Sequence, residues 1–288
     1  MIPWPAEVIP DDWRHWSLAE PELIRPLTNG LTNRSFLLNT VKGKVVLRWN
    51  SPISVQLDLD RRAEAQALQL ARGLSAPLVY CDPDQRYLVT QFIDGKAWPS
   101  GPPDTHLQLR KLARLTRSIH QLPTIDLQLD INAKISAYRQ STGNDRQGLR
   151  QLNRDIHAHI ISAEAMGDHK VLCHNDLQRE NLISDRNGQL YAIDWEYAAT
   201  GDPFYELAVI TEEHQLQGTR LEAFLTEYLR RPVDKQDLLR LRHWQVIYTY
   251  LTLLWYAVQL SQDTMPEVHS GTKIKALKQH LSNLLQGF

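Results

Sequence analysis

The most informative stretch of this chain of 288 residues is His174-Asn-Asp-Leu-Gln-Arg-Glu-Asn-Leu-Ile183, which is followed by Ile193-Asp-Trp-Glu196. Asp176 and Asn181 share one short loop, and Asp194 ends the next strand-like run. Mg²⁺ prefers a few hard oxygen ligands, so Asn181 and Asp194 suit metal binding and leave Asp176 to accept a hydroxyl proton. This pattern is typical of kinase-type phosphoryl transfer, in which catalysis consists of positioning and charge neutralisation.

These strings resemble the catalytic loop and metal-binding segment of aminoglycoside phosphotransferase and choline kinase-like enzymes. They are most similar to choline/ethanolamine kinases and bacterial thiamine kinases, and Asp202-Pro-Phe-Tyr-Glu-Leu-Ala208 continues the similarity. Protein kinases have H-R-D and D-F-G motifs instead. The resemblance implies an α+β, bilobal protein-kinase-like fold. Its small, β-rich N-lobe is expected over residues 1–94, and its larger, mainly helical C-lobe over residues 95–288.

The resemblance also implies roles for individual residues of the loop. Asp176 is expected to be the catalytic base, and Asn181 and Asp194 the Mg²⁺ ligands. His174 is expected to brace the loop, and Gln178 to contact metal-bound water or phosphate.

The expected N-lobe contributes the contacts to ATP. Arg48 matches the cation that binds the phosphates, and Glu64 matches the acidic residue that orients it. The family often has lysine at position 48, but a planar guanidinium can hold phosphates bidentately. The other expected contacts come from a polar loop with a single glycine, which covers the phosphates, and from a hinge that meets the adenine: Asn29, Gly30, Thr32, Asn33, Gln91, Phe92 and Ile93.

The expected acceptor site combines an anion with aromatic rings. Glu196 and Tyr197 directly follow the metal-binding run, and Trp244, Tyr248 and Trp255 recur at helical spacing on one face. Aromatic faces with a carboxylate hold quaternary or heteroaromatic cations, so choline and thiamine both fit. The aromatic stripe is equally compatible with ordinary core packing.

Composition narrows the possible partners. The net charge is −1, with 32 basic and 33 acidic residues, so neither nucleic acid nor a membrane surface is an expected partner. Cys81 and Cys173 imply neither a disulfide framework nor a zinc site. The most apolar run, residues 251–258, is too short to span a bilayer, and the N-terminus has no secretory pattern. We therefore expect a cytoplasmic protein; its oligomeric state stays open.

Periodicity predicts a hairpin around Lys42-Gly43, a helix over 58–72, strands over 76–80 and 87–93, and a Gly- and Pro-rich linker over 94–103. Two strand-like runs, 171–174 and 189–194, flank a turn at 185–188. The remaining predicted helices cover residues 105–121, 131–139, 147–166, 204–216, 219–230, 235–261 and 267–286.

The sequence thus predicts an ATP- and Mg²⁺-dependent small-molecule kinase that phosphorylates the hydroxyl of a small cationic alcohol of the choline or thiamine type. Alternatives are an aminoglycoside or other small-molecule kinase of the same fold, and a nucleotide-binding pseudokinase without turnover. A metal-dependent hydrolase using His174, Asp176 and Asp194 is a third, although a second histidine with ligand spacing is missing.

Overall fold

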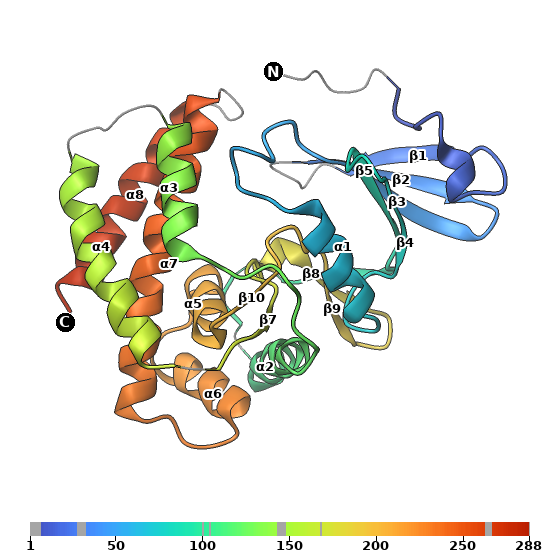
Figure 1. Ribbon diagram of the computed structural model, residues 1–288. Coiled ribbons are helices and arrows are strands. Elements are labelled where there is room, and N and C mark those ends of the chain that lie inside the picture. Colours follow the sequence, from blue (N-terminus) through green and yellow to red (C-terminus); the bar gives the residue numbers. More distant parts are fainter. Residues whose placement is uncertain are drawn as a thin grey trace.

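The computed structural model describes residues 7–27, 33–99, 101–103, 105–142, 148–167, 169–262 and 267–287. Figure 1 shows a small part built on a β-sheet beside a larger part built of helices. A short 3₁₀ helix, Trp13–His15, precedes the sheet. In the described part of the chain, no helix combines the length and apolar character needed to cross a bilayer.

The sheet of the small part is antiparallel throughout and has the order β1-β2-β3-β5-β4. The hairpin predicted around Lys42-Gly43 joins its second and third strands; Gly43 has a φ of 117°, which glycine adopts without steric cost. Alternate side chains such as Leu38, Leu47 and Val89 are fully buried on one face. The strands are β1 (Glu22–Leu27), β2 (Arg34–Thr40), β3 (Gly43–Trp49), β4 (Leu78–Cys81) and β5 (Tyr87–Gln91).

Helix α1 (Arg61–Leu70) follows the hairpin and is shorter than predicted. It begins after Asp60, whose side chain caps it by accepting hydrogen bonds from two backbone amides of the first turn. Asp58 has a φ of 53°, which is incompatible with a helix. Two charged residues of α1, Arg61 and Glu64, are buried, so this helix carries charge into the protein interior.

The helices of the larger part lie close to their predicted positions. The longest, α7, packs against α3, α4, α5 and α8 in one continuous hydrophobic core. The helices are α2 (His106–His120), α3 (Ile131–Ser141), α4 (Gly148–Ala165), α5 (Pro203–Glu213), α6 (Gly218–Leu229), α7 (Lys235–Ser261) and α8 (Glu267–Leu285).

The central strands form two small sheets, whose pairing the sequence analysis did not predict. β7 (Val171–Cys173) pairs with β10 (Ala199–Gly201), whereas β9 (Leu190–Ala192) pairs with β8 (Leu182–Asp185) across the predicted turn. The predicted linker also contains a strand, β6 (Gly95–Ala97), which pairs with β8. The catalytic loop therefore connects two different sheets.

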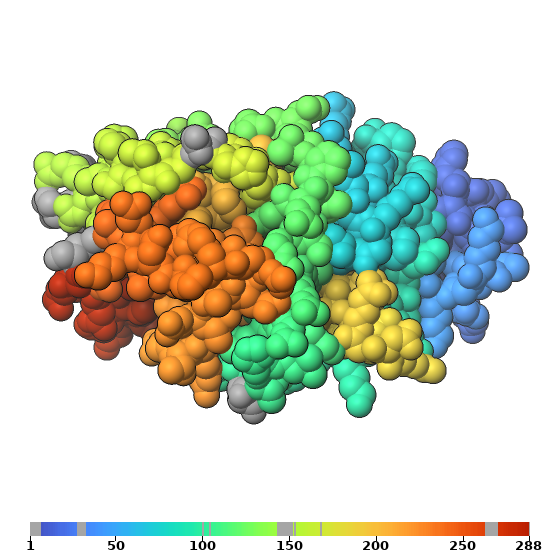
Figure 2. Space-filling view, turned by 90° about the horizontal axis from the view of Figure 1, so that it is seen from below, coloured from blue at the N-terminus to red at the C-terminus, as the bar shows by residue number. Residues whose placement is uncertain are grey.

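The hairpin β8–β9 also joins the two parts of the molecule. The amide of Ala192 donates to the Leu74 carbonyl at 2.8 Å, and the Gln189 side chain donates to the Gly73 carbonyl at 2.7 Å. Figure 2 shows this hairpin in yellow against the cyan residues of the small part. The loop that follows β7 is consequently held at the junction of the two parts.

Candidate active site

The loop after β7 holds the predicted base between two amide side chains. Asn181, the last residue of a 3₁₀ turn (Arg179–Asn181), donates from Nδ2 to Asp176 Oδ2 at 2.7 Å and to the Asp176 carbonyl at 2.9 Å. Gln178 Nε2 donates to the same Oδ2 at 3.3 Å. Burial and the neighbouring charge of Asp194 raise the pKa of Asp176 well above its usual value.

Asp194 lies directly beside this loop, just after β9. The amide of Ile193 donates to the Asn181 carbonyl at 2.9 Å, which brings residues 181 and 194 to one end of the β8–β9 pair. Asp194 has a φ of 63° and Asn175 a φ of 64°, both in the left-handed region that is costly for residues other than glycine. Such strained positions cluster at functional sites. Together, the Asp194 carboxylate and the Asn181 amide offer the hard oxygen donors that Mg²⁺ requires.

His174 connects the loop to the strand that carries Asp194. It is fully buried, donates from Nε2 to the Ile193 carbonyl at 3.0 Å and accepts at Nδ1 from the Asp176 amide at 3.3 Å. Its ring lies 4.7 Å from that of Trp195. Burial lowers the pKa of His174, so the neutral ring that these hydrogen bonds require is favoured. These contacts suit the bracing role expected for it.

Glu206, a buried carboxylate that the sequence analysis did not identify as a site residue, stabilises the loop. Glu206 of α5 accepts from the Asn175 amide at 2.6 Å and from the His174 amide at 3.0 Å. His120 Nε2 donates to it at 2.8 Å. Burial alone would raise the pKa of Glu206, but the hydrogen bond and charge of His120 lower it. The side chains of His120, Cys173 and Glu206 lie close enough together to hold a metal ion. However, His120 and Glu206 are already hydrogen-bonded to each other.

A chain of alternating charges crosses from the small part to the catalytic strand. Arg48 contacts Asp194 at 2.5 Å and Glu64 at 2.6 Å. Arg61 contacts Glu64 at 3.1 Å and Glu196 at 2.7 Å. The structure thus brings the predicted pair Arg48 and Glu64 together and connects it to both acidic residues after β9.

Arg61 is the member of this chain that sequence reasoning missed. The sequence did place this arginine three residues before Glu64 on the same predicted helix. That spacing is usual for exposed ion pairs, so it did not point to a buried site. Glu196 is only 6% exposed and is held by Arg61 and by Asn33 Nδ2, which donates at 2.7 Å. Asn33 Oδ1 in turn accepts from Arg61 and from the Ser51 amide. The structure therefore uses Glu196 and Asn33 to join the two parts, and their expected contacts with substrate and nucleotide stay predictions.

The hinge offers one unused amide. The amides of Gln91 and Phe92 donate to the carbonyls of Pro77 and Lys44, whereas that of Ile93 makes no hydrogen bond within the described residues. Ile93 is therefore the hinge residue that could donate to adenine. The other expected nucleotide contacts, Asn29, Gly30 and Thr32, lie outside the described residues.

A second carboxylate and three aromatic side chains lie near Asp176 in two hydrogen-bonded pairs. Tyr248 donates to Glu213 Oε1 at 2.6 Å, and Trp255 Nε1 donates to the Tyr197 hydroxyl at 2.9 Å. We call these four residues the aromatic–acidic cluster. The charge of Glu213 contributes to raising the pKa of Asp176, which places the cluster close to the predicted base. Trp244 is not part of this cluster.

Trp244 is 2% exposed and packs edge-on against Tyr205 in the core. The predicted stripe is therefore divided, with Tyr248 and Trp255 at the site and Trp244 in the core. Glu213, which the sequence analysis also missed, is half-buried and forms no ion pair within 4 Å in the described part of the chain. Burial raises its pKa, although the more distant charge of Lys273 acts to lower it. A half-buried carboxylate that is hydrogen-bonded to a tyrosine and has no cation within ion-pair distance is a candidate site for a cationic ligand.

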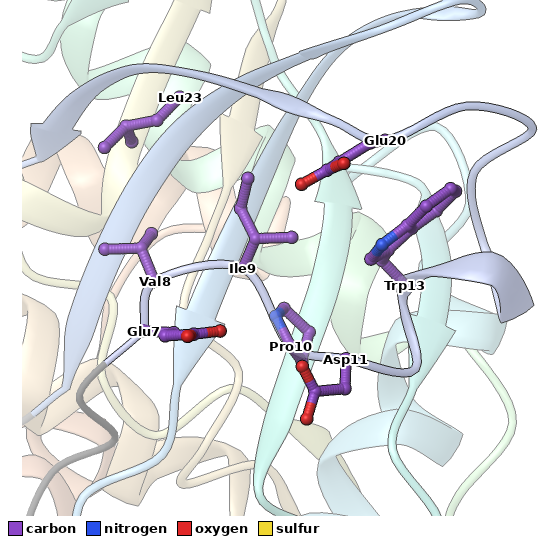
Figure 3. A pocket seen from close by; sticks show the side chains of 8 residues that line it. All are labelled: Glu7, Val8, Ile9, Pro10, Asp11, Trp13, Glu20 and Leu23. Atoms are coloured by element: carbon purple, nitrogen blue, oxygen red, sulfur yellow. The ribbon is translucent and has the colours of Figure 1, made fainter.

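Two cavities are notable, and one of them borders the aromatic–acidic cluster at Tyr197. One, of about 600 Å³, opens beside Glu196 and Tyr197 and is bordered by Asp58 and Lys134. The other, of about 260 Å³, is formed by the N-terminal segment, with Trp13 and Leu23 among its walls, and shares no residue with the catalytic loop (Figure 3).

Comparison with known proteins agrees with this arrangement. Residues 23–244 match the model of the family described as "Phosphotransferase enzyme family". A LicA homologue of Mycoplasma capricolum is 27% identical over 183 residues, which cover 62% of this chain and 70% of that protein. Ethanolamine kinase 1 of Mus musculus is 25% identical over 250 residues, covering 74% and 68%. Thiamine kinase of Escherichia coli is 26% identical over 199 residues, covering 69% of each.

Solved structures share the fold. Choline kinase LicA from Streptococcus pneumoniae superposes with a TM-score of 0.79 at 19% identity, covering 96% of this chain and 97% of that one. Another LicA structure, a complex with AMP, has a TM-score of 0.76 at 19% identity, covering 92% of each chain. These findings confirm the expected family and kinase-like fold. The chain therefore belongs to the phosphotransferase enzyme family, and it is an enzyme of the kinase type.

Proposed function

We propose that this protein transfers the γ-phosphoryl group of ATP, with Mg²⁺, to the hydroxyl group of a small cationic alcohol of the choline, ethanolamine or thiamine type. The observation that carries the choice of acceptor is Glu213. Its half-buried carboxylate lies near the proposed base, accepts a hydrogen bond from Tyr248 and has no ion-pair partner within the described residues, the charge of Lys273 acting only from farther away.

On the nucleotide side, Asn181 and Asp194 would hold Mg²⁺, which when bound neutralises phosphate charge and aligns the γ-phosphoryl group. Arg48 would contact the phosphates. In the structure its guanidinium contacts Asp194 and Glu64, so it is oriented toward the proposed metal site. The Ile93 amide is left to receive the adenine.

On the acceptor side, Asp176 would accept the proton of the attacking hydroxyl group. Asn181 and Gln178 hold its Oδ2, so the carboxylate has a defined direction when the substrate arrives. An ammonium group near Glu213 would gain a charge partner and the ring of Tyr248, which is hydrogen-bonded to that carboxylate. Because a primary hydroxyl group lies only two carbons from the nitrogen in choline, this arrangement can present it to Asp176.

A coupled assay of ATP consumption with Mg²⁺ tests the proposal. Choline, ethanolamine, thiamine and an aminoglycoside are compared as acceptors, and we expect turnover with at least one of the first three. Asp176→Asn should lose turnover by at least about a thousandfold and still bind Mg-ATP, because it removes the proton acceptor and keeps the shape. Asp84→Asn, a substitution in an exposed turn, is the matched control.

Two outcomes would contradict the proposal. If none of the acceptors raised ATP consumption above background, the protein would be a nucleotide-binding pseudokinase or would act on another acceptor. If Asp176→Asn kept wild-type turnover, the proton would go elsewhere.

A further inference from the structure

The cavity of about 600 Å³ beside the active site contains a cation of the protein itself. Lys134 of α3 extends its side chain into this cavity, where only 13% of the side chain is exposed. Its ammonium group lies 5.5 Å from the ring centroid of Tyr138 and 5.7 Å from that of Tyr197. It donates to the Asp58 carbonyl at 3.1 Å and to Asp58 Oδ2 at 3.4 Å.

This set of partners is one that proteins use to bind ammonium ligands. Two aromatic faces within about 6 Å attract a cation through the ring quadrupoles, and the two oxygens accept its hydrogen bonds. Tyr138 is 2% exposed, so one wall of the site is fixed in the core. An ammonium site is therefore present, and a side chain of the same chain fills it.

Tyr197 connects this site to the aromatic–acidic cluster. Its ring faces Lys134, its hydroxyl accepts from Trp255, and its backbone carbonyl accepts from Asn175 of the catalytic loop. A cationic acceptor that packs on Tyr197 would come close to the Lys134 ammonium group. Like charges at such a distance in a partly desolvated site repel one another measurably.

The hydrogen-bond partner of Lys134, Asp58, allows the ammonium group to be displaced from this site. The Asp58 side chain is 53% exposed and belongs to the segment between the sheet and α1, where water can replace the lysine. Burial lowers the pKa of Lys134, against the opposing charges of Asp58 and Glu196, so keeping the charge in this place has a cost.

We propose that Lys134 determines acceptor specificity: its ammonium group occupies the Tyr138–Tyr197 site and competes with the cation of the acceptor. A quaternary ammonium alcohol has to displace Lys134 or bind despite its repulsion, whereas an uncharged alcohol does not meet this barrier. The part of the inference that concerns turnover rests on the proposed function; the competition between cations does not.

The test measures binding of choline and of tetramethylammonium to the full chain by titration calorimetry. Lys134→Met keeps the length of the side chain and removes its charge. We expect the dissociation constants of both cations to fall by about tenfold, because each cation gains a cation–π contact and no longer meets the repulsion of Lys134. Lys134→Arg, which keeps a cation over the rings, should stay near the wild-type value. Lys42→Met, in the exposed β2–β3 turn, is the control for net charge.

The uncharged analogue of choline, 3,3-dimethylbutan-1-ol, separates competition between charges from a simple gain of space, and its binding should not tighten in Lys134→Met. The inference is overturned if the cations bind Lys134→Met no more tightly than wild type, or if the neutral analogue gains as much. If Lys134→Met does not fold, judged by thermal unfolding, Lys134→Gln takes its place. If cations bind Lys134→Met more tightly but choline is not phosphorylated, the proposed acceptor class is refuted, whereas the competition between Lys134 and cationic ligands is supported.

Discussion

Arg61 offers the sharpest test of how the two parts of the molecule are joined. Its side chain is 4% exposed and is the buried cation that faces Glu196, whose other polar contact is Asn33. Arg61→Met leaves the Glu196 carboxylate buried without its ion-pair partner, whereas Glu64 keeps Arg48. Breaking a buried ion pair in this way costs about 3–5 kcal/mol of unfolding free energy.

The double variant makes the prediction specific. Glu196→Gln alone removes a charge but leaves Arg61 paired with Glu64, so its cost should be about 1–2 kcal/mol. In Arg61→Met/Glu196→Gln no uncompensated carboxylate remains, and the two losses should fall short of additivity by about 1.5 kcal/mol or more.

Urea unfolding followed by tryptophan fluorescence measures these differences. Arg62→Met, on the exposed side of the same helix, is the matched control and should change stability by less than about 0.5 kcal/mol. If the effects of Arg61→Met and Glu196→Gln add to within about 0.5 kcal/mol, the two side chains do not depend on one another and the reasoning fails. Because Glu64 also loses a neighbour, Arg61→Met should raise the KM for Mg-ATP as well.

Three further predictions concern the metal, the acceptor and pH. Asp194→Ala should abolish the dependence of nucleotide affinity on Mg²⁺, measured by calorimetry with and without the metal; an unchanged affinity for Mg-ATP would exclude its role as a ligand. Glu213→Gln should raise the KM for a cationic acceptor about tenfold by removing the charge partner, and an unaltered KM would argue against the proposed acceptor site. His159 and His243 contact one another at 2.9 Å between α4 and α7, and burial lowers the pKa of both. Below the ordinary pKa of 6.5 the unfolded chain therefore binds more protons than the folded one. The contribution of the two neutral histidines to stability is complete above pH 6.5 and is lost as the pH falls below that value. His243→Gln should make thermal stability between pH 7 and 5 less sensitive to acid, and a pH profile identical to that of the wild type would refute this.

The helices and the identity of the site could be predicted because both depend on local order in the chain. Helix α7 has the bounds that apolar periodicity predicts, and α2 and α5 differ from their predictions by only a few residues. Asp176 and Asn181 share one loop, so the hydrogen bond between their side chains needs little information from elsewhere.

The strand pairing could not be predicted, because pairing depends on which distant strands are brought together. The two predicted runs do not pair with each other: Val171–Cys173 pairs with Ala199–Gly201, and Leu190–Ala192 pairs with Leu182–Asp185. Short apolar runs satisfy their backbone hydrogen bonds equally well with several partners, and only the packing of the whole chain selects one.

By itself the sequence determined the family, the kinase-like fold and the set of oxygen-bearing side chains near residues 174–196, since these follow from residue types at short, fixed spacing. Only the tertiary structure decided which charges became internal partners. It paired Glu196 with Arg61, put Trp244 in the core, and placed Glu213 and Lys134 beside the aromatic rings. The physical reason is that the role of a charge or a ring depends on its burial and its neighbours, and here those neighbours come from helices and loops far apart in the chain.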